Sequence, residues 1–404
     1  MKQTELDHIL SAVLQLRPKA SDLNFTVGRP IQAETDGILE EVNIKPNFPR
    51  LTPFQTEEIA LAVLNDDRRL TEILIREGSC DCSYSLPGQA RFRVNIFSQR
   101  STYSIVMRRL ETKVPTIEEL DLPETFIKMA EEQNGIIFIT GATGSGKSTT
   151  LAAILEHINQ NKAVHVVTLE DPVEFLHPHI KATFNQRELR KDFPNFSTGL
   201  RAALRQAPKV ILVGEMRDRE TVEIGLNAAE TGHLVLTSLH TINTGQTINR
   251  LLGMFDKDEE GQVRSRLADT IRWIGCQRLV PKIDGGRQAV MEVMGTNLRV
   301  KDSILHGERE GKTFYEITKE SSNFGWCTFD DSLIDAYQTG KITKETAETH
   351  ATVRANVARG IDKIKSVRGQ KTSDIEDLNL DQQYEDTRMR QASSVKKKEG
   401  RRKR

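Results

Sequence analysis

A glycine-rich segment between an apolar run and a helical stretch carries the clearest chemical signal in the sequence. Residues 136–139 are β-branched and aromatic, as a buried strand is, and the glycines after them let successive backbone N–H groups turn toward one point. The start of the following helix adds a dipole that favours a phosphate. In such a GxxxxGKS pattern we expect Lys147 to reach the β- and γ-phosphates of a nucleotide and the Ser148 hydroxyl to bind Mg²⁺. The residues predicted to contact the nucleotide are Gly141, Ala142, Thr143, Gly144, Ser145, Gly146, Lys147, Ser148 and Thr149.

Polar side chains follow three further apolar runs at the points where these runs end. Glu170, Asp171 and Glu174 follow the run 164–169, Glu215 follows 210–213, and His240 follows 233–238. In parallel sheets, ligands lie at the carboxyl ends of the strands, so we expect these groups to surround the phosphate site. Carboxylates beside a phosphate repel it unless a cation intervenes or one of them orients water. The sequence therefore predicts a metal-dependent phosphate site.

The elements that must position these groups alternate between strand and helix. We expect strands at 136–140, 164–169, 210–213 and 233–238, and helices at 147–158, 196–205 and 220–230. This alternation predicts an α/β domain with a parallel sheet covered on both faces. Beyond the sheet, the ranges 251–274, 298–305, a stretch beginning at Thr328 and the range 343–368 are expected to be helical.

Residues 1–110 show a different pattern. Helical spacing at 4–16 and 51–64, a short strand at 23–27 and alternating residues at 90–97 and 104–110 predict a small α+β domain without a cofactor motif. The second half of this domain is rich in arginine: Arg91, Arg93, Arg100, Arg108 and Arg109. Residues 111–133 contain two prolines and are expected to form a linker with one short helix, followed by a second domain over 134–371.

Composition restricts the remaining possibilities. A chain of 404 residues suggests two or three domains, and 57 Lys plus Arg against 57 Asp plus Glu give no overall bias toward nucleic acid. Cys80 and Cys82 lie too close together for a zinc knuckle, so we expect all four cysteines to be reduced thiols. The absence of a long apolar run predicts a cytoplasmic protein without a membrane span. The charged segment 372–404 is expected to be disordered and solvated, because it offers almost nothing apolar to a core.

Four segments together resemble a known family. The segments 141–153, 169–175, 211–218 and 229–240 resemble the Walker A, Asp box, Walker B and His box of the type IV pilus retraction ATPases, the PilT/PilU group of secretion ATPases. The segments 21–23 and 90–95 resemble the N-terminal domain of that group, and the resemblance extends over about residues 1–366. It implies a small PAS-like N-terminal domain followed by a RecA-like P-loop domain, with ATP and Mg²⁺ bound between the two domains of a homo-hexameric ring.

The resemblance also implies roles for individual residues. Glu174 would be the base that orients the attacking water, and Glu215 would support the metal together with Ser148. His233 and His240 would sense the state of the γ-phosphate. Arg93 and Arg108 would be delivered from an N-terminal domain to neutralise the transferred charge, which phosphoryl transfer requires.

The implied partners are an inner-membrane pilus platform protein and another pilus ATPase, at the inner face of the cytoplasmic membrane, with no nucleic acid. The chain departs from the family at 295–305, where an expected motif is poorly matched, and in the charged segment 372–404. Two other stretches, 204–209 and 351–365, resemble PilU more than PilT.

Three alternatives stay open. A pilus-assembly or type II secretion ATPase shares the four boxes but usually carries a CxxC pair that this sequence lacks. A ring ATPase acting on DNA would be expected to show a basic and aromatic stretch in its folded part. A nucleotide-binding regulator of a partner ATPase would hydrolyse little, whereas every predicted catalytic position is filled here.

Overall fold

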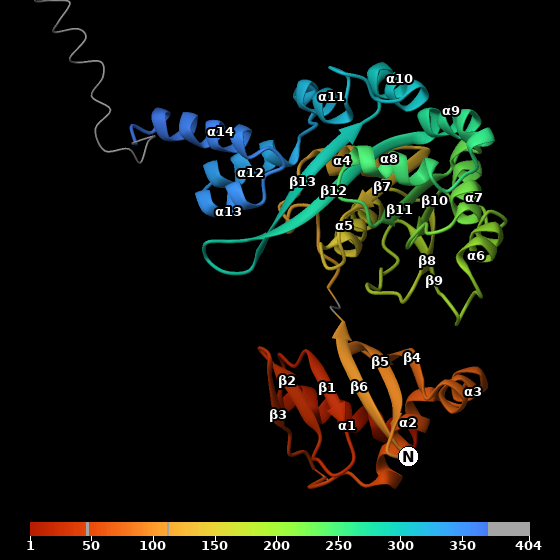
Figure 1. The fold of residues 1–404 in the computed structure, drawn as a ribbon. Coiled ribbons are helices and arrows are strands. Elements are labelled where there is room, and N and C mark those ends of the chain that lie inside the picture. The colour runs from red at the N-terminus through yellow and green to blue at the C-terminus, as the bar shows by residue number, and fades with distance from the viewer. Residues whose placement is uncertain (46–47, 111–112, 371–404) are drawn as a thin grey trace, which may run out of the picture.

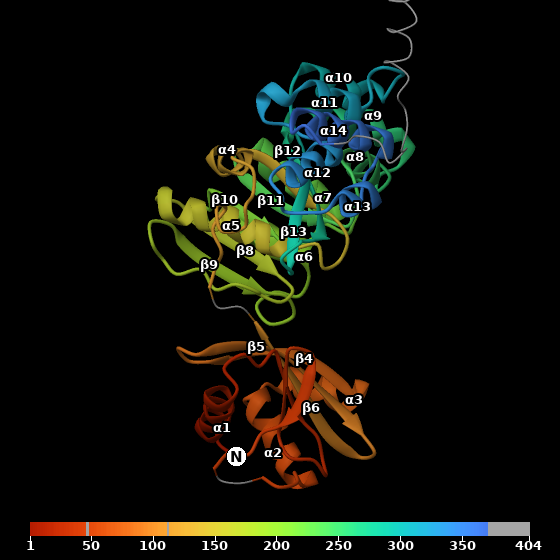
Figure 2. The ribbon, with the colours of Figure 1, turned by 90° about the vertical axis from the view of Figure 1, so that its left-hand side faces the viewer.

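The computed structural model describes residues 1–45, 48–110 and 113–370. Figures 1 and 2 both show two units, a smaller N-terminal one and a larger C-terminal one. The predicted disordered segment at 372–404 lies outside the described residues.

The N-terminal unit is a six-stranded antiparallel sheet packed against helices. In β5 (Ala90–Gln99) the alternate residues Phe92, Val94 and Ile96 are buried, which confirms the predicted half-buried strand. The strand order is β3-β2-β1-β6-β5-β4. The other elements are α1 (Gln3–Leu16), β1 (Asp22–Phe25), β2 (Gln32–Thr35), β3 (Ile38–Glu41), α2 (Pro53–Leu64), α3 (Arg68–Glu77), β4 (Ser79–Leu86) and β6 (Thr102–Leu110).

The larger unit is built on a seven-stranded sheet in the order β13-β12-β7-β11-β10-β8-β9. All neighbouring strands are parallel except β13, which is antiparallel to β12. This arrangement confirms the predicted α/β class. The strands are β7 (Gly135–Thr140), β8 (His165–Glu170), β9 (Thr183–Glu188), β10 (Val210–Val213), β11 (Leu234–Leu239), β12 (Ile271–Pro281) and β13 (Arg287–Gly295).

Helices cover both faces of this sheet. In β7, Ile137 and Ile139 pack with α4 (Thr125–Glu131) and α5 (Lys147–Asn161), whereas Ile136 and Phe138 belong to the core on the other face. That second face is covered by α6 (Phe196–Ala203), α7 (Arg219–Glu230), α8 (Thr244–Leu252) and α9 (Glu260–Thr270). The remaining elements are η1 (Lys257–Glu259), α10 (Leu298–His306), α11 (Phe314–Glu320), η2 (Ser322–Phe324), α12 (Phe329–Gln338), α13 (Lys344–Thr349) and α14 (Arg354–Val367). Within the described ranges, no helix combines the length and the apolar character that a membrane span needs.

Three strands of the sheet, β9, β12 and β13, lie where the sequence analysis predicts helix or no element. The helical prediction for 251–274 fails after α9, because the chain enters β12 at Ile271 and pairs with both β7 and β13. Two neighbouring strands satisfy the backbone of β12 on both sides, and such long-range pairing outweighs local preference. The edge strand β9 was likewise not predicted.

The predicted linker also differs from the structure. Ile117, Leu122 and Phe126 are buried in the same cluster as Ile137 and Ile154. The helix α4 is tied to the far end of the chain, because Thr125 Oγ1 donates to the carbonyl oxygen of Gly325 at 2.8 Å. Residues 117–131 therefore belong to the core of the larger unit rather than to a solvated connection.

Removing the buried ring of α4 tests this assignment. Phe126→Ala deletes a fully buried side chain, so it should lower the free energy of unfolding of the larger unit by about 3–5 kcal/mol. The exposed neighbour Lys128→Ala is the matched control and should change it little. Urea unfolding followed by circular dichroism measures both. If both variants changed the free energy of unfolding only slightly and equally, the segment would be a linker and not part of the core.

Candidate functional site

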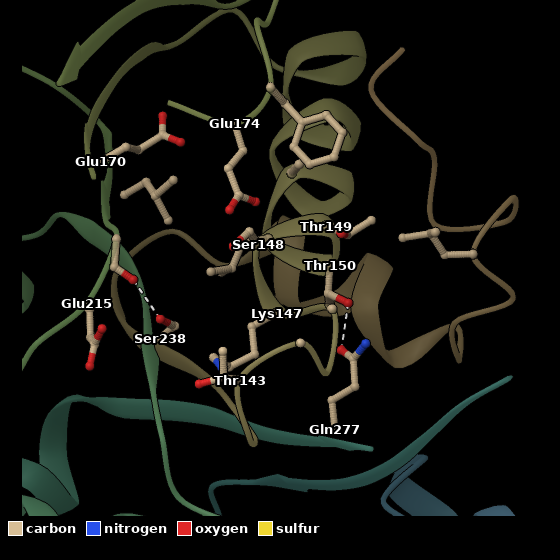
Figure 3. Close-up of a pocket in the computed structure, with 18 of the residues that line it drawn as sticks. Thr143, Lys147, Ser148, Thr149, Thr150, Glu170, Glu174, Glu215, Ser238 and Gln277 are labelled. Carbon is tan, nitrogen blue, oxygen red and sulfur yellow. Dashed lines mark hydrogen bonds between the residues drawn. The ribbon is translucent and has the colours of Figure 1, made fainter. Parts of the chain in front are cut away.

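A cavity of about 1170 Å³ opens at the carboxyl ends of the parallel strands. Figure 3 shows residues of the glycine-rich loop, the loop after β8, the end of β10 and the end of β11 facing this space. Further lining residues come from 119–122, from β13 and from Lys341. All the lining residues belong to the larger unit. Of the predicted nucleotide contacts, the lining includes Thr143, Gly144, Gly146, Lys147, Ser148 and Thr149.

The glycine-rich loop is pressed against β12. A Cβ atom at Gly141 would lie 2.4 Å from the carbonyl oxygen of Gln277 and 2.6 Å from Ser145 Oγ. At Gly146 it would lie 2.8 Å from Gln277 Nε2, and both glycines have positive φ angles, 148° and 87°. Only glycine fits such positions without a shift of the backbone. Gln277 also accepts a hydrogen bond from Thr150 Oγ1 at 2.7 Å, which fixes the first turn of α5.

The start of α5 has the properties of an anion site. Its N-cap, Gly146, provides no side-chain cap, whereas Asn195, Asp218 and Asn243 cap α6, α7 and α8. The N–H groups of the first turn of α5 are thus free of a capping side chain and point toward the cavity end of the helix. Among the described residues, the buried Ser145 Oγ also has no hydrogen-bond partner. A phosphate would satisfy these groups.

Lys147 lies beside these groups in a nearly buried position. Its Nζ donates to the carbonyl oxygens of Gly141 at 2.9 Å and Ala142 at 3.0 Å. Burial lowers the pKa of Lys147, and the carboxylates of Glu215 and Glu174 oppose this effect. A nearly buried ammonium whose short hydrogen bonds go to neutral carbonyl oxygens gains from an anion in reach. These features fit the phosphates of a nucleotide.

Glu215 contacts Arg217 and His240, and His240 in turn contacts Lys147. Its Oε2 is 2.7 Å from Arg217 Nη2 and 3.3 Å from His240 Nε2, and His240 Nδ1 is 3.5 Å from Lys147 Nζ. Burial raises the pKa of Glu215, but Arg217 and His240 outweigh this effect, so the pKa lies below its ordinary value. Glu215 is therefore an ionised carboxylate at neutral pH and can attract a cation.

The side chains beside the P-loop can supply part of an Mg²⁺ site. Over the described ranges, no group of three or more His, Cys, Asp and Glu side chains could hold a metal ion by itself. This agrees with the way Mg²⁺ binds beside nucleotides, through one or two carboxylates together with phosphate oxygens and waters. Ser148 and Glu215 both line the cavity and can supply the protein part of such a site.

The two glutamates of the loop after β8 occupy different environments. Figure 3 shows Glu174 directed toward Ser148, with Glu170 set farther from the P-loop. Burial raises the pKa of Glu170 to about 7, although Thr168 and Gln186 donate hydrogen bonds that lower it. Glu174 therefore faces the cavity as the available carboxylate, while Glu170 is part of the wall.

The structure does not bring the predicted arginines to this cavity. Arg93 and Arg108 lie opposite each other on β5 and β6, and the Nε of the exposed Arg108 pairs with Asp22 Oδ1 at 2.9 Å. A different arginine connects the two units. Arg91 Nη2 lies 2.7 Å from Glu188 Oε2 of β9, and Ser83 Oγ donates to Glu188 Oε1 at 3.0 Å. This largely buried ion pair has no local signal in the sequence, because its partners are 97 residues apart.

His233 is placed away from the cavity. It precedes the first residue of β11, whereas His240 follows the last. The two histidines therefore lie at opposite ends of this strand, about 20 Å apart along it. Its Nδ1 is 2.9 Å from the carbonyl oxygen of Ala228. The prediction that His233 binds the nucleotide held by its own P-loop is therefore wrong. His240, in contrast, lines the cavity and lies beside Lys147 and Glu215.

The environment of Glu170 predicts a pH-dependent stability. The unfolded chain releases this proton near the ordinary pKa of about 4.3, whereas the folded chain retains it up to about 7. Stability is therefore lost as the pH rises through this window, and the penalty is complete above it. Glu170→Gln cannot ionise, so it should raise the thermal midpoint by several degrees more at pH 8 than at pH 5. The exposed Glu223→Gln controls for the loss of one negative charge. An equal gain at both pH values would contradict the assignment.

Comparisons with known proteins agree with this site. Residues 81–374 match the family described as Type II/IV secretion system protein. The chain is 39% identical over 341 residues to the type IV pilus retraction ATPase PilT of Pseudomonas aeruginosa, which covers 83% of this chain and 96% of that relative. It is 40% identical over 339 residues to the type IV pilus ATPase PilU of the same organism, which covers 84% of this chain and 87% of that relative.

Among solved structures, the chain is similar to the pilus retraction motor PilT with bound ADP. The TM-score is 0.78 at 36% identity, and the alignment covers 89% of this chain and 99% of that chain. Since the family covers most of the sequence and the relatives align over nearly their whole length, the chain belongs to the Type II/IV secretion system protein family, and within it the chain is similar to the pilus retraction ATPases.

Proposed function

We propose that this protein hydrolyses Mg²⁺–ATP and that it is a motor of type IV pilus retraction, the function named for PilT. The observation that carries the proposal is the placement of charged groups on two sides of the P-loop. Lys147, His240 and Glu215 lie on one side, and Glu174 lies on the other. This arrangement supplies a cation for the phosphates, a carboxylate for a metal and a second carboxylate for water.

Binding of ATP would exchange the present partners of Lys147. Its ammonium would leave the carbonyl oxygens of Gly141 and Ala142 for the β- and γ-phosphates, and the uncapped first turn of α5 would receive the phosphate oxygens. Ser148 and Glu215 would hold Mg²⁺, which neutralises charge that develops on the phosphate oxygens. Movement of the Lys147 ammonium would also break its contact with His240, so His240 is placed to respond to the phosphate.

Glu174 is the better candidate for the base. The Oε2 atom of Glu215 already contacts Arg217 and His240, and Glu170 accepts hydrogen bonds from Thr168 and Gln186 in the cavity wall. Glu174 faces the space beyond Ser148, where a water in line with the γ-phosphate would lie. Its carboxylate can orient this water and accept its proton as the bond to phosphorus forms.

Phosphoryl transfer is accelerated by arginines that neutralise the charge on the transferred phosphate. Arg93 and Arg108 are exposed on the N-terminal unit and do not line the cavity of their own chain. We propose that they act on the nucleotide of a neighbouring subunit in a homo-hexameric ring. The ring would work with an inner-membrane pilus platform protein, and with another pilus ATPase, at the inner face of the cytoplasmic membrane.

The proposed base predicts a separation of binding from turnover. Glu174→Gln keeps the size of the side chain but cannot accept a proton, so ATP should still bind while phosphate release falls by about 100-fold or more. Fluorescent-nucleotide titration and steady-state phosphate release measure the two properties. Glu215→Gln should weaken Mg²⁺ binding, so that a higher Mg²⁺ concentration is needed for half-maximal turnover. Normal turnover of Glu174→Gln together with inactivity of Glu215→Gln would reverse the two roles.

A shared site predicts complementation between inactive chains. Lys147→Ala removes the phosphate contact and Arg108→Ala removes the donated arginine, so each protein alone should be nearly inactive. In mixed rings some interfaces combine an intact P-loop with an intact arginine, so part of the activity should return. A mixture of Lys147→Ala with Glu174→Gln is the control, since both defects lie on one side of the interface. Recovery no greater than in that control would contradict delivery between subunits.

A further inference from the structure

The loop that carries Glu174 is held by hydrogen bonds to the backbone of its neighbours. Gln186 Nε2 donates to the carbonyl oxygen of Phe175 at 2.8 Å, and the N–H of His177 donates to Gln186 Oε1 at 2.9 Å. The same Nε2 lies 3.2 Å from Glu170 Oε1. Glu170 ends β8 before the loop, while Phe175 and His177 follow Glu174 directly. One amide group therefore connects both sides of the segment that carries Glu174.

The register of the edge strand places this amide. In the parallel pair of β8 and β9, Gln186 lies opposite Thr168, and Thr168 Oγ1 donates to Glu170 Oε1 at 2.7 Å. Two residues earlier on the same face of β9, Phe184 stacks on the ring of His177 with centroids 4.7 Å apart. This face of β9 is thus the surface on which the Glu174 loop rests.

A second anchor ties the loop to the P-loop helix. His177 Nδ1 lies 3.4 Å from Glu156 Oε2 of α5, and both side chains are buried. Gln160 Nε2 donates to the other oxygen of Glu156 at 2.9 Å. The loop is therefore fixed at once to the sheet edge and to the helix whose first turn meets the phosphates.

We propose that Gln186 is a positioning residue for hydrolysis, one that sets where the Glu174 carboxylate lies relative to the γ-phosphate. The inference rests on the proposed role of Glu174 and extends it to a residue that does not touch ATP. A glutamine is suited to this place because it presents one acceptor to an N–H and two donors to oxygens. A carboxylate here would repel two oxygen atoms. An aliphatic side chain would leave the carbonyl oxygen of Phe175 and the N–H of His177 without this partner, whereas Glu170 would keep the hydrogen bond from Thr168.

A positioning residue affects the rate of hydrolysis without affecting nucleotide affinity, whereas a residue needed for folding affects both. Misplacing a catalytic group by about 1 Å can cost about 100-fold in rate without loss of binding. The P-loop contacts of ATP do not include β9, so nucleotide affinity should be preserved. The effect should also depend on Glu174, because Gln186 acts only through the loop that carries this residue.

The test uses the full-length chain with Gln186→Leu and, as a second variant of nearly unchanged size, Gln186→Glu. Both should lower kcat by about 10–100-fold while the affinity for a fluorescent ATP analogue stays within about threefold. The matched control is Asn185→Ala, which removes an amide on the opposite face of β9, where it meets His165 Nε2 at 2.8 Å. This control should retain kcat within about twofold.

The decisive variant combines Gln186→Leu with Glu174→Gln. If Gln186 acts through Glu174, the double variant should be no slower than Glu174→Gln alone, whereas independent effects would multiply. Multiplication, or a kcat for both single Gln186 variants equal to that of the unchanged protein, would overturn the inference while leaving the proposed base intact. Normal turnover by Glu174→Gln would instead refute the assigned base, and the inference would fall with it.

Discussion

The close contact between the P-loop and β12 is the constraint on which the site depends. The carbonyl oxygen and the side-chain amide of Gln277 occupy the space where Cβ atoms of Gly141 and Gly146 would lie. Neither loop position can therefore carry a side chain while β12 lies beside β7, a pairing that runs in register from Ile137 to Thr140. The phosphate site is thus a product of the sheet and not of the glycine-rich sequence alone.

Electrostatic interactions around Lys147 add to this packing contact in preparing the phosphate site. The buried Lys147 is surrounded by carbonyl oxygens and by the ionised Glu215, so the site holds a desolvated cation and a desolvated anion close together. On the far side, β9 anchors the Glu174 loop through Gln186 and meets Arg91 of the N-terminal unit through Glu188. Gln186 and Glu188 are two residues apart and share a face, so one strand touches both the catalytic loop and the other unit.

The parts of this protein that could be predicted from its sequence are those with a local signal. The apolar run before Gly141 and the spacing up to Lys147 and Ser148 identify the P-loop, and acids at strand ends identify its edge of the sheet. The hairpin of β12 and β13 was missed because its strands are defined by partners far along the chain. The two prolines within 111–133 predict a linker, although Phe126 and its neighbours are core residues.

Errors within the site have a similar origin. His233 and His240 are seven positions apart in one motif. Strand β11 lies between them, so they lie at its opposite ends. Gln186 and His177 belong to no phosphate-binding pattern, and their contacts arise only from the register of β9 beside β8. Polar residues whose role is to hold a loop leave no periodic signal in a single sequence.

The measurement that tests the central claim most directly is phosphate release from ATP by the purified full-length chain without any partner, with Mg²⁺ and after its removal by chelation. The account predicts sustained release that requires Mg²⁺. The account would be contradicted if the chain bound nucleotide tightly but released phosphate no faster than the Lys147→Ala variant. That result would favour a regulator that binds ATP but depends on another ATPase for turnover.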